Sequence, residues 1–216
     1  MNAEGRLRQQ HARALLDSLH PAHCGDLPEP LLQQARQSGL GRRYLARTAL
    51  RHAPSVFAPN HERWQLWQNA EPWLQWTQQR LHAFTLTLGG IALAPALRMI
   101  VERNAVLFVR SALGAENWRR AQSVDPWQGP APEAVRHRGE ALLQCCGRDA
   151  LALAAEIHER GKIEFIGHAE RRDENLAARL ALAYASPPAR PCSEACWLPA
   201  STVPMLLSMH DAEVST

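Results

Sequence analysis

Two motifs near the carboxyl end combine residue types that can bind zinc. His168 and Glu170 form a His-x-Glu motif, and Cys192 and Cys196 follow it, with a proline just before Cys192. Zinc-dependent nucleobase deaminases carry His-x-Glu and a later Pro-Cys-x-x-Cys, in which the histidine and both thiolates hold the metal and the glutamate moves the proton. One interpretation is therefore a zinc-dependent hydrolase or deaminase that uses His168, Glu170, Cys192 and Cys196.

Three features of the sequence argue against this chemistry. Three residues, and not two, separate Cys192 from Cys196. The deaminase fold places strands around both motifs, whereas the chain before His168 has a helical pattern. Pro199 and Pro204 would break the helix that should carry the thiolates. We therefore prefer a protein that is not an enzyme and has no metal or cofactor, with an exposed His168 and two cysteines in a tail.

A row of arginines is the second candidate site. Arg43, Arg47 and Arg51 are four residues apart, so they share one face of the helix expected over 42–52. Such a row could bind phosphates, which makes a helical nucleic-acid-binding protein the second alternative. The net charge is only +3, from 24 basic and 21 acidic residues. We therefore prefer a solvated face or a contact with an acidic protein, and no nucleic acid.

Four tryptophans follow in a polar context rich in glutamine. Trp64 and Trp67 are three residues apart, as are Trp73 and Trp76, so each pair would be adjacent on a helix. Tryptophans of this kind either fill a core or anchor a partner protein. We expect most of the four to be half-buried packing residues, with one or two as partner-binding anchors.

The spacing of apolar residues predicts a mainly α protein with one compact domain of about eight helices over 1–185. The Pro-rich stretch 125–132 is the best internal boundary. Leu97 and Val101 are expected in the core of the most apolar stretch, 83–113. Gly161 is expected to end a helix, and 162–167 alternates as a strand or loop would. Helices are expected over 4–19, 29–37, 42–52, 116–122, 133–146, 149–160 and 173–185, with helical spacing also in the tryptophan-rich stretch 60–76 and in the apolar stretch 83–113.

Residues 186–216 are expected to form an extended tail. Five prolines lie between Ser186 and Met205, and the stretch has little apolar periodicity. Truncation at Ser186 is therefore expected to leave the fold intact.

The sequence also bears on the compartment. No apolar stretch follows the first residues, so we expect no secretory signal peptide. The longest uncharged run, 83–97, is shorter than the roughly 20 residues of a spanning helix. Five cysteines, an odd number, indicate reduced thiols. We expect a cytoplasmic protein without direct membrane insertion.

Several short segments together resemble one protein family. Leu-His-Pro at 19–21 and Asp-Leu-Pro at 26–28 resemble its opening. The later segments are 88–98, which begins Leu-Gly and ends Leu-Arg, 109–114 with Arg-x-x-Leu-Gly, 139–143 and 179–182. The family that these segments resemble is the SctK/YscK-type proteins of type III secretion, with the Hrp-type proteins of plant-associated bacteria as the nearest group. The resemblance covers roughly residues 15–187. The sequence departs from the family after the last helix, where Ala-Tyr-Ala-Ser-Pro replaces a basic Lys-Leu-Pro-like run.

The resemblance implies a non-enzymatic helical adaptor in the cytosolic sorting platform of the injectisome. Such an adaptor links the cytosolic domain of the inner-membrane ring protein (SctD-type) to the pod protein (SctQ-type). It lies at the cytoplasmic face of the inner membrane and takes part in protein transport and virulence. The family offers no catalytic residues to transfer to this chain.

Overall fold

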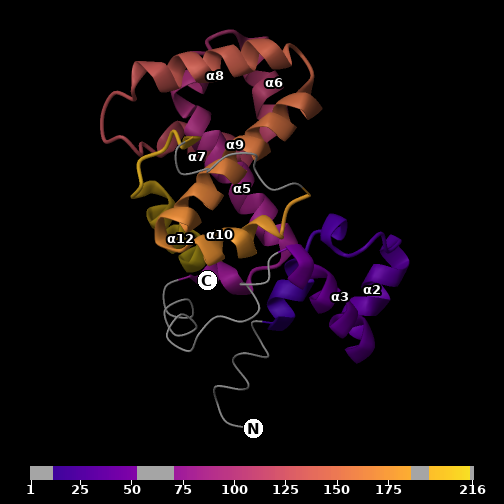
Figure 1. Cartoon of the computed structure of the whole chain (residues 1–216). Helices are drawn as coiled ribbons and strands as arrows, with labels where there is room; N and C mark the ends of the chain where they lie inside the picture. The colour runs from indigo at the N-terminus through magenta and orange to yellow at the C-terminus, as the bar shows by residue number, and fades with distance from the viewer. Residues whose placement is uncertain (1–11, 53–70, 186–194, 215–216) are drawn as a thin grey trace. The chain divides into compact units, whose positions relative to one another are not determined.

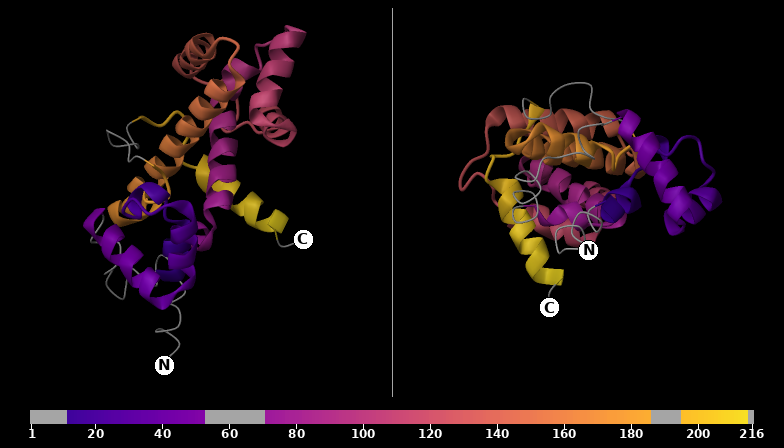
Figure 2. Two further views of the ribbon diagram at one scale, coloured as in Figure 1. Left: turned by 90° about the vertical axis from the view of Figure 1, so that its right-hand side faces the viewer. Right: turned by 60° about the horizontal axis from the view of Figure 1, so that its bottom comes forward.

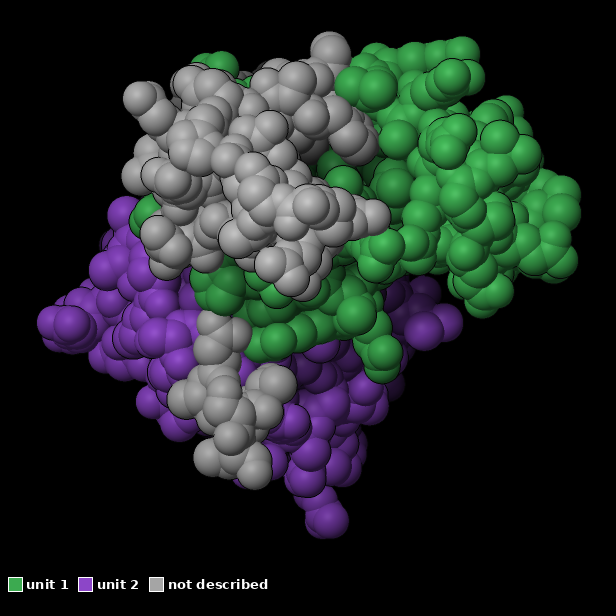
Figure 3. Space-filling view, turned by 90° about the horizontal axis from the view of Figure 1, so that it is seen from below, with its two compact units in different colours: residues 1–81, 169–190 green, residues 82–168, 191–216 purple. Residues whose placement is uncertain are grey.

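The structure, a computed structural model, describes residues 12–52, 71–185 and 195–214 (Figure 1). These residues contain ten helices and no strand, so the predicted mainly α class is confirmed, with more helices than the eight expected. The chain divides into two compact units (Figure 3). Unit 1 comprises residues 1–81 and 169–190, and unit 2 comprises residues 82–168 and 191–216. The single compact domain is not confirmed, and the expected boundary at 125–132 lies inside unit 2.

Unit 1 packs its amino-terminal helices against a segment that is distant in sequence. Its elements are a helix over 12–18, η1 (Pro21–His23), α2 (Glu29–Gln37), α3 (Gly39–His52), η3 (Pro72–Gln75) and α10 (Glu174–Ala181). Asp173 caps α10 as predicted, since its carboxylate accepts a hydrogen bond from the Asn175 amide. The core side chains are Leu15, Leu16, Leu19, Cys24, Leu32, Leu45, Ala49 and Leu182.

Three hydrogen bonds fix the turn around the Leu-His-Pro motif within unit 1. The His20 amide donates to the carbonyl of Leu182 at 2.8 Å, and the His23 ring bonds the carbonyl of Tyr184 at 2.8 Å. The Arg36 guanidinium donates to the carbonyl of Leu19. The motif therefore has a structural role, because it holds the chain reversal before α2 in place.

Unit 2 contains most of two long helices, α5 (Gln78–Leu97) and α9 (Ala150–Arg172), and four shorter ones. The shorter helices are α6 (Arg103–Leu113), α7 (Ala115–Ser123), α8 (Glu133–Cys146) and α12 (Thr202–Val214). The buried core side chains are Leu93, Ala94, Leu97, Val109, Leu113, Ala121, Leu153 and Ile157. By length and composition α5 could also cross a membrane, and 72% of its most apolar window is buried inside the structure, as in a core helix.

Helices α5 and α9 lie side by side in unit 2, and glycines allow their backbones to approach closely (Figure 2). A Cβ atom at Gly161 would lie 1.7 Å from the carbonyl oxygen of Thr85, and one at Gly89 would lie 1.8 Å from that of Ile157. The sequence predicted that Gly161 ends a helix. This prediction is wrong, because α9 continues through Gly161 to Arg172. A glycine inside a helix costs only about 1 kcal/mol relative to alanine. The close packing of α5 on α9, which is possible only without a side chain at this position, outweighs that cost.

The predicted strand or loop at 162–167 is wrong, because α9 continues through it. Nearly every residue there is buried, including Lys162, Glu164, Phe165 and Ile166. A helix covered on all sides loses the amphipathic period, so the short alternating pattern carried no information about the backbone.

The close contact gives a first prediction. Gly161→Ala is expected to lower the free energy of unfolding by about 1–3 kcal/mol, because the added methyl group must push α5 and α9 apart. Urea denaturation followed by circular dichroism measures the change. Gly39→Ala is the matched control, since nothing lies within 4 Å of a Cβ at Gly39, and it should be neutral or stabilising. Equal stability of the Gly161→Ala and wild-type proteins would contradict the packing.

The carboxyl-terminal part differs from the extended tail that the sequence predicted. Residues 202–214 form α12, and among the described residues just before it Leu198 is buried as well. Pro204 lies in the first turn of α12, where a missing N–H group costs nothing. The buried side chains in this part are Leu198, Thr202, Val203, Leu206 and Leu207.

Candidate functional site

The predicted arginine row lies on the exposed side of α3. Arg43, Arg47 and Arg51 are all exposed, so the prediction that they share one accessible helix face is confirmed. Three apolar or aromatic side chains are exposed on the same helix: Leu40 at 80%, Tyr44 at 44% and Leu50 at 38%. We call the six residues Leu40, Arg43, Tyr44, Arg47, Leu50 and Arg51 the α3 surface.

The opposite side of α3 fixes this surface to unit 1. Leu45 and Ala49 on that side belong to the unit 1 core. From the α3 surface itself, the Tyr44 hydroxyl donates to the carbonyl of Gly25 at 3.3 Å. Arg42 turns the other way, and its guanidinium donates to the carbonyl of Arg36 at 2.6 Å. Consecutive arginines therefore differ in role, since Arg42 is structural and Arg43 is exposed.

The charge of the α3 surface is uncompensated within the described part of the chain. No ion pair between its arginines and a described carboxylate occurs, and the first turn of α3 contains no acidic residue. Three exposed positive charges on one helix face therefore attract anionic groups from outside the protein.

Sequence reasoning missed Leu40, Tyr44 and Leu50. Gly39 and Gly41 suggested a break before residue 42, so Leu40 lay outside the expected helix, whereas α3 begins at Gly39. Spacings of three and four residues through 40, 43, 44 and 47 do mark one helix face. That signal was available once the helix start was known.

Trp73 and Trp76 are not available to a partner, which corrects their assignment as anchors. They are 3% and 4% exposed. The Trp73 indole N–H donates to the Glu71 carboxylate at 2.5 Å, and the Arg80 guanidinium lies 4.1 Å from the centre of the Trp76 ring. Both tryptophans therefore pack inside the protein, which is the other interpretation of this cluster. Trp64 and Trp67 lie outside the described residues.

A network of buried charge surrounds Trp73 in unit 1. Glu71 is 3% exposed and pairs with Arg172 at 2.5 Å. Burial raises the pKa of Glu71, although the Trp73 N–H and the Arg172 charge favour the ionised form. Arg179 is fully buried and donates to the carbonyl of Leu74 at 2.8 Å, and burial lowers its pKa to about 10. These contacts join η3 to α10, and the residue before η3 to the end of α9.

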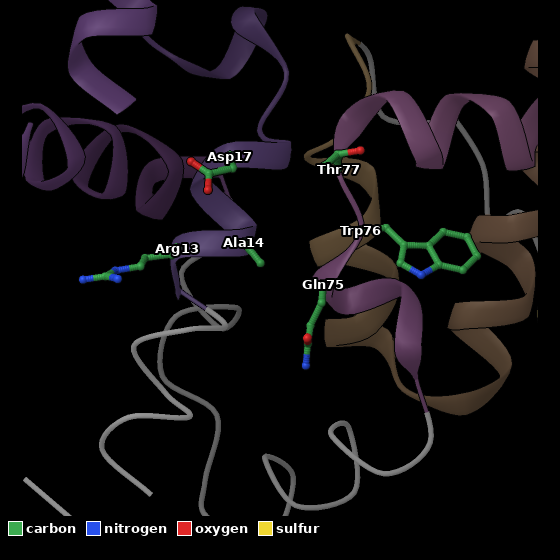
Figure 4. A pocket seen from close by; sticks show the side chains of 6 residues that line it. All are labelled: Arg13, Ala14, Asp17, Gln75, Trp76 and Thr77. Atoms are coloured by element: carbon green, nitrogen blue, oxygen red, sulfur yellow. The ribbon is translucent and has the colours of Figure 1, made fainter. Parts of the chain in front are cut away.

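A pocket of about 360 Å³ opens in unit 1 between the helix over 12–18 and the end of η3 (Figure 4). Arg13 and Asp17 come from the helix, and Gln75, Trp76 and Thr77 come from the other side. In Figure 4 the Arg13 side chain points away from Gln75 and Trp76. The lining therefore offers no converging set of polar groups.

The zinc motif is not assembled in the part of the chain that the structure describes. His168 is 5% exposed within α9, so the expected exposed histidine is wrong. The Cys196 thiol lies 3.8 Å from the carbonyl of Ile163, and Cys192 lies outside the described residues. No three His, Cys, Asp or Glu side chains among residues 12–52, 71–185 and 195–214 come together as metal ligands would.

Instead, the residues around Cys196 fasten the carboxyl-terminal segment to α9. The Glu164 carboxylate is 1% exposed and accepts hydrogen bonds from the amides of Trp197 at 2.7 Å and Leu198 at 3.2 Å. Arg160 pairs with Glu164 at 3.1 Å and donates to the carbonyl of Ala195. Burial raises the pKa of Glu164, and the Arg160 charge and the two amides oppose the shift. We call Arg160 and Glu164 the α9 clamp.

A histidine pair at the α5–α9 contact gives a second prediction. His158 stacks on His82 at 4.1 Å and lies 3.4 Å from the Thr85 hydroxyl. Burial and the neighbouring His82 lower the pKa of His158 to about 4, with Lys162 adding to the shift and Glu159 opposing it. The folded protein thus prefers neutral His158. The stability that neutral His158 contributes is fully present above its pKa in the unfolded chain, about 6.5. That stability is lost as the pH falls toward about 4, its pKa in the folded protein.

We expect this loss to be about 1–2 kcal/mol, since partial exposure screens the charge. Urea denaturation near neutral pH and near pH 4.5 measures it, and His158→Gln should lose less stability on acidification than the wild type. The exposed His137 supplies the control variant, His137→Gln. Identical pH dependence of the His158→Gln and wild-type proteins would contradict a buried neutral His158.

Comparison with models of protein families, with curated proteins and with solved structures gives no match to this chain.

Proposed function

We propose that this protein is a non-enzymatic cytoplasmic adaptor of a type III secretion injectisome. In this role it links the SctD-type inner-membrane ring protein to the SctQ-type pod protein of the sorting platform. The α3 surface is the observation that carries the adaptor role. It is exposed, basic and partly apolar, and the rest of α3 holds it rigidly to unit 1. The identity of the two partners comes from the resemblance of the sequence segments.

A surface of this kind suits protein binding. Interfaces are enriched in arginine and aromatic residues, and hot spots combine such side chains with a desolvated surround. Leu40 exposes 80% of its surface, which is costly in water and favourable under a partner.

Co-expression with the SctD-type and SctQ-type cytosolic proteins of the same gene cluster tests the proposal. We expect the wild-type chain to co-purify with at least one of them. The triple variant Arg43→Glu, Arg47→Glu, Arg51→Glu should lower recovery of that partner by at least about tenfold, because reversed charges repel an acidic surface. Arg119, Arg138 and Arg148 are also exposed, so their triple replacement by glutamate is the matched control.

The outcomes separate cleanly. Loss of the complex in the α3 variant and not in the control would support the proposal. Absence of any complex with folded wild-type protein would reject the injectisome partners. Strong, salt-dependent retention of nucleic acid by the α3 arginines would favour the nucleic-acid alternative, and one bound zinc per chain that is lost in Cys192→Ala would favour the zinc alternative.

A further inference from the structure

The α3 surface combines charge and apolar area in a single narrow band. At about 100° per residue, its six side chains lie within an arc of about 120°, with Arg47 near the middle. Leu40 and Leu50 lie toward opposite ends of the helix, and Tyr44 lies one turn from Leu40. The arginines therefore alternate with apolar side chains and do not form a separate charged patch.

This alternation discriminates between kinds of partner. Nucleic-acid backbones are bound through charged and polar contacts to phosphate and sugar, and they offer nothing to cover Leu40 or Leu50. A second copy of this chain would bring arginines against arginines on the same face, and like charges across an interface cost free energy. An uncharged apolar partner would leave three guanidinium groups desolvated and unpaired.

We propose that the α3 surface binds an acidic amphipathic helix of a partner protein. Carboxylates four residues apart on that helix pair with Arg43, Arg47 and Arg51, and its apolar side chains cover Leu40, Tyr44 and Leu50. The helical rise places Leu40 and Arg51 about 16 Å apart along the axis, so about three turns of partner helix match the surface. This inference rests on the proposed function, since it names the chemistry of one partner segment.

Both halves of the recognition are needed. Guanidinium groups form bidentate hydrogen bonds with carboxylates and supply orientation. Covering the exposed leucines supplies the apolar contribution, about 25 cal/mol per Å² removed from water. Exposed ion pairs alone contribute little, so a binding helix that lacks apolar residues would bind weakly.

A peptide experiment tests the inference without the injectisome proteins. The probe is a fluorescent peptide of about 16 residues with glutamates at every fourth position and leucines beside them on one helix face. Its affinity for the full chain is measured by fluorescence anisotropy. A scrambled peptide of the same composition and a single-stranded oligonucleotide of equal charge serve as comparison ligands. We expect the helical peptide to bind at least about tenfold more tightly than either.

Two matched variants separate charge from apolar contact. Replacing Arg43, Arg47 and Arg51 by glutamine, or Leu40 and Leu50 by glutamine, should each weaken peptide binding by about tenfold. The salt dependence of binding should fall only in the arginine variant. All five residues are exposed, so the thermal unfolding of both variants should match that of the wild type.

Four results would overturn the inference: no binding of the helical peptide, equal binding of the scrambled peptide, tighter binding of the oligonucleotide, or an unchanged affinity in the leucine variant. The proposed function fails separately. Peptide binding without co-purification of the SctD-type or SctQ-type protein would reject those partners and leave the inference standing. Co-purification that survives both variants would support the adaptor and reject the α3 surface as its site.

Discussion

A chain that ends at Ala185 is expected to lose the cooperative thermal unfolding of the full protein. The deletion removes four buried apolar side chains, Leu198, Val203, Leu206 and Leu207. Full burial of such a side chain contributes about 1.5–3 kcal/mol, so the four together contribute about 6–12 kcal/mol as an upper estimate. That is comparable with the whole stability of a typical protein, about 5–15 kcal/mol.

The deletion also leaves the α9 clamp without its partners. Glu164 accepts hydrogen bonds from the Trp197 and Leu198 amides, and Arg160 donates to the carbonyl of Ala195. Without that segment, the Glu164 carboxylate loses both amide donors and keeps its ion pair with Arg160. Leaving a buried polar group unsatisfied costs about 1–3 kcal/mol, and more when the group is charged. The deletion therefore exposes apolar surface and weakens a buried charge pair at once.

Far-ultraviolet circular dichroism during heating measures the effect. A chain that ends at His210 is the control, because it keeps all four buried side chains, and it should unfold as the full protein does. Wild-type unfolding of the shorter chain would mean that residues 186–216 add nothing to the fold, as the sequence alone suggested.

The class of the fold could be predicted from the sequence, because apolar spacing reports which faces of a helix are buried. The same local signals failed where distant contacts decide the structure. Gly161 reads as a helix end, yet α9 continues because the glycine lets the Thr85 backbone approach. The residues near Gly161 in the sequence do not indicate that Thr85, 76 residues earlier, packs against it.

The prediction for the carboxyl-terminal segment was wrong for a related reason. Its prolines suggested an extended tail, but Pro204 lies in the first turn of α12, where proline is tolerated. The contacts that order the segment come from Glu164 and Arg160, more than thirty residues earlier. Charged residues are usually exposed, so a sequence-based prediction places them on the surface. The burial of the α9 clamp therefore could not be predicted from the residues near it in the sequence.

The exposure of the candidate residues could be predicted for the arginines but not for the tryptophans, and the difference has a physical reason. The exposed face of a helix is readable from spacing, so Arg43, Arg47 and Arg51 were placed correctly. Whether a tryptophan is exposed depends on what covers it, and Trp73 and Trp76 turn out to be covered. Aromatic residues in a polar stretch therefore predict exposure less reliably than charges that repeat along one helix face.

The second large effect is expected at the end of α5. Leu97→Asp should lower the free energy of unfolding by at least about 4 kcal/mol, because it removes a buried leucine and introduces an unpaired buried charge. Leu97 is fully buried in the unit 2 core with Leu93, Leu113 and Ile157. Urea denaturation measures the loss, and a variant that is unfolded without urea would meet the expectation.

Val101→Asp is the matched control, only four residues away. The sequence predicted both residues in the core, but α5 ends at Leu97 and Val101 is 94% exposed. The helical period therefore stops before it reaches Val101, and a charge there stays in water, so the change should be within about 0.5 kcal/mol of zero. Equal losses in both variants would mean that the apolar pattern continues beyond α5. Normal stability of Leu97→Asp would mean that this end of α5 is exposed, and its leucines would then be candidates for an interface.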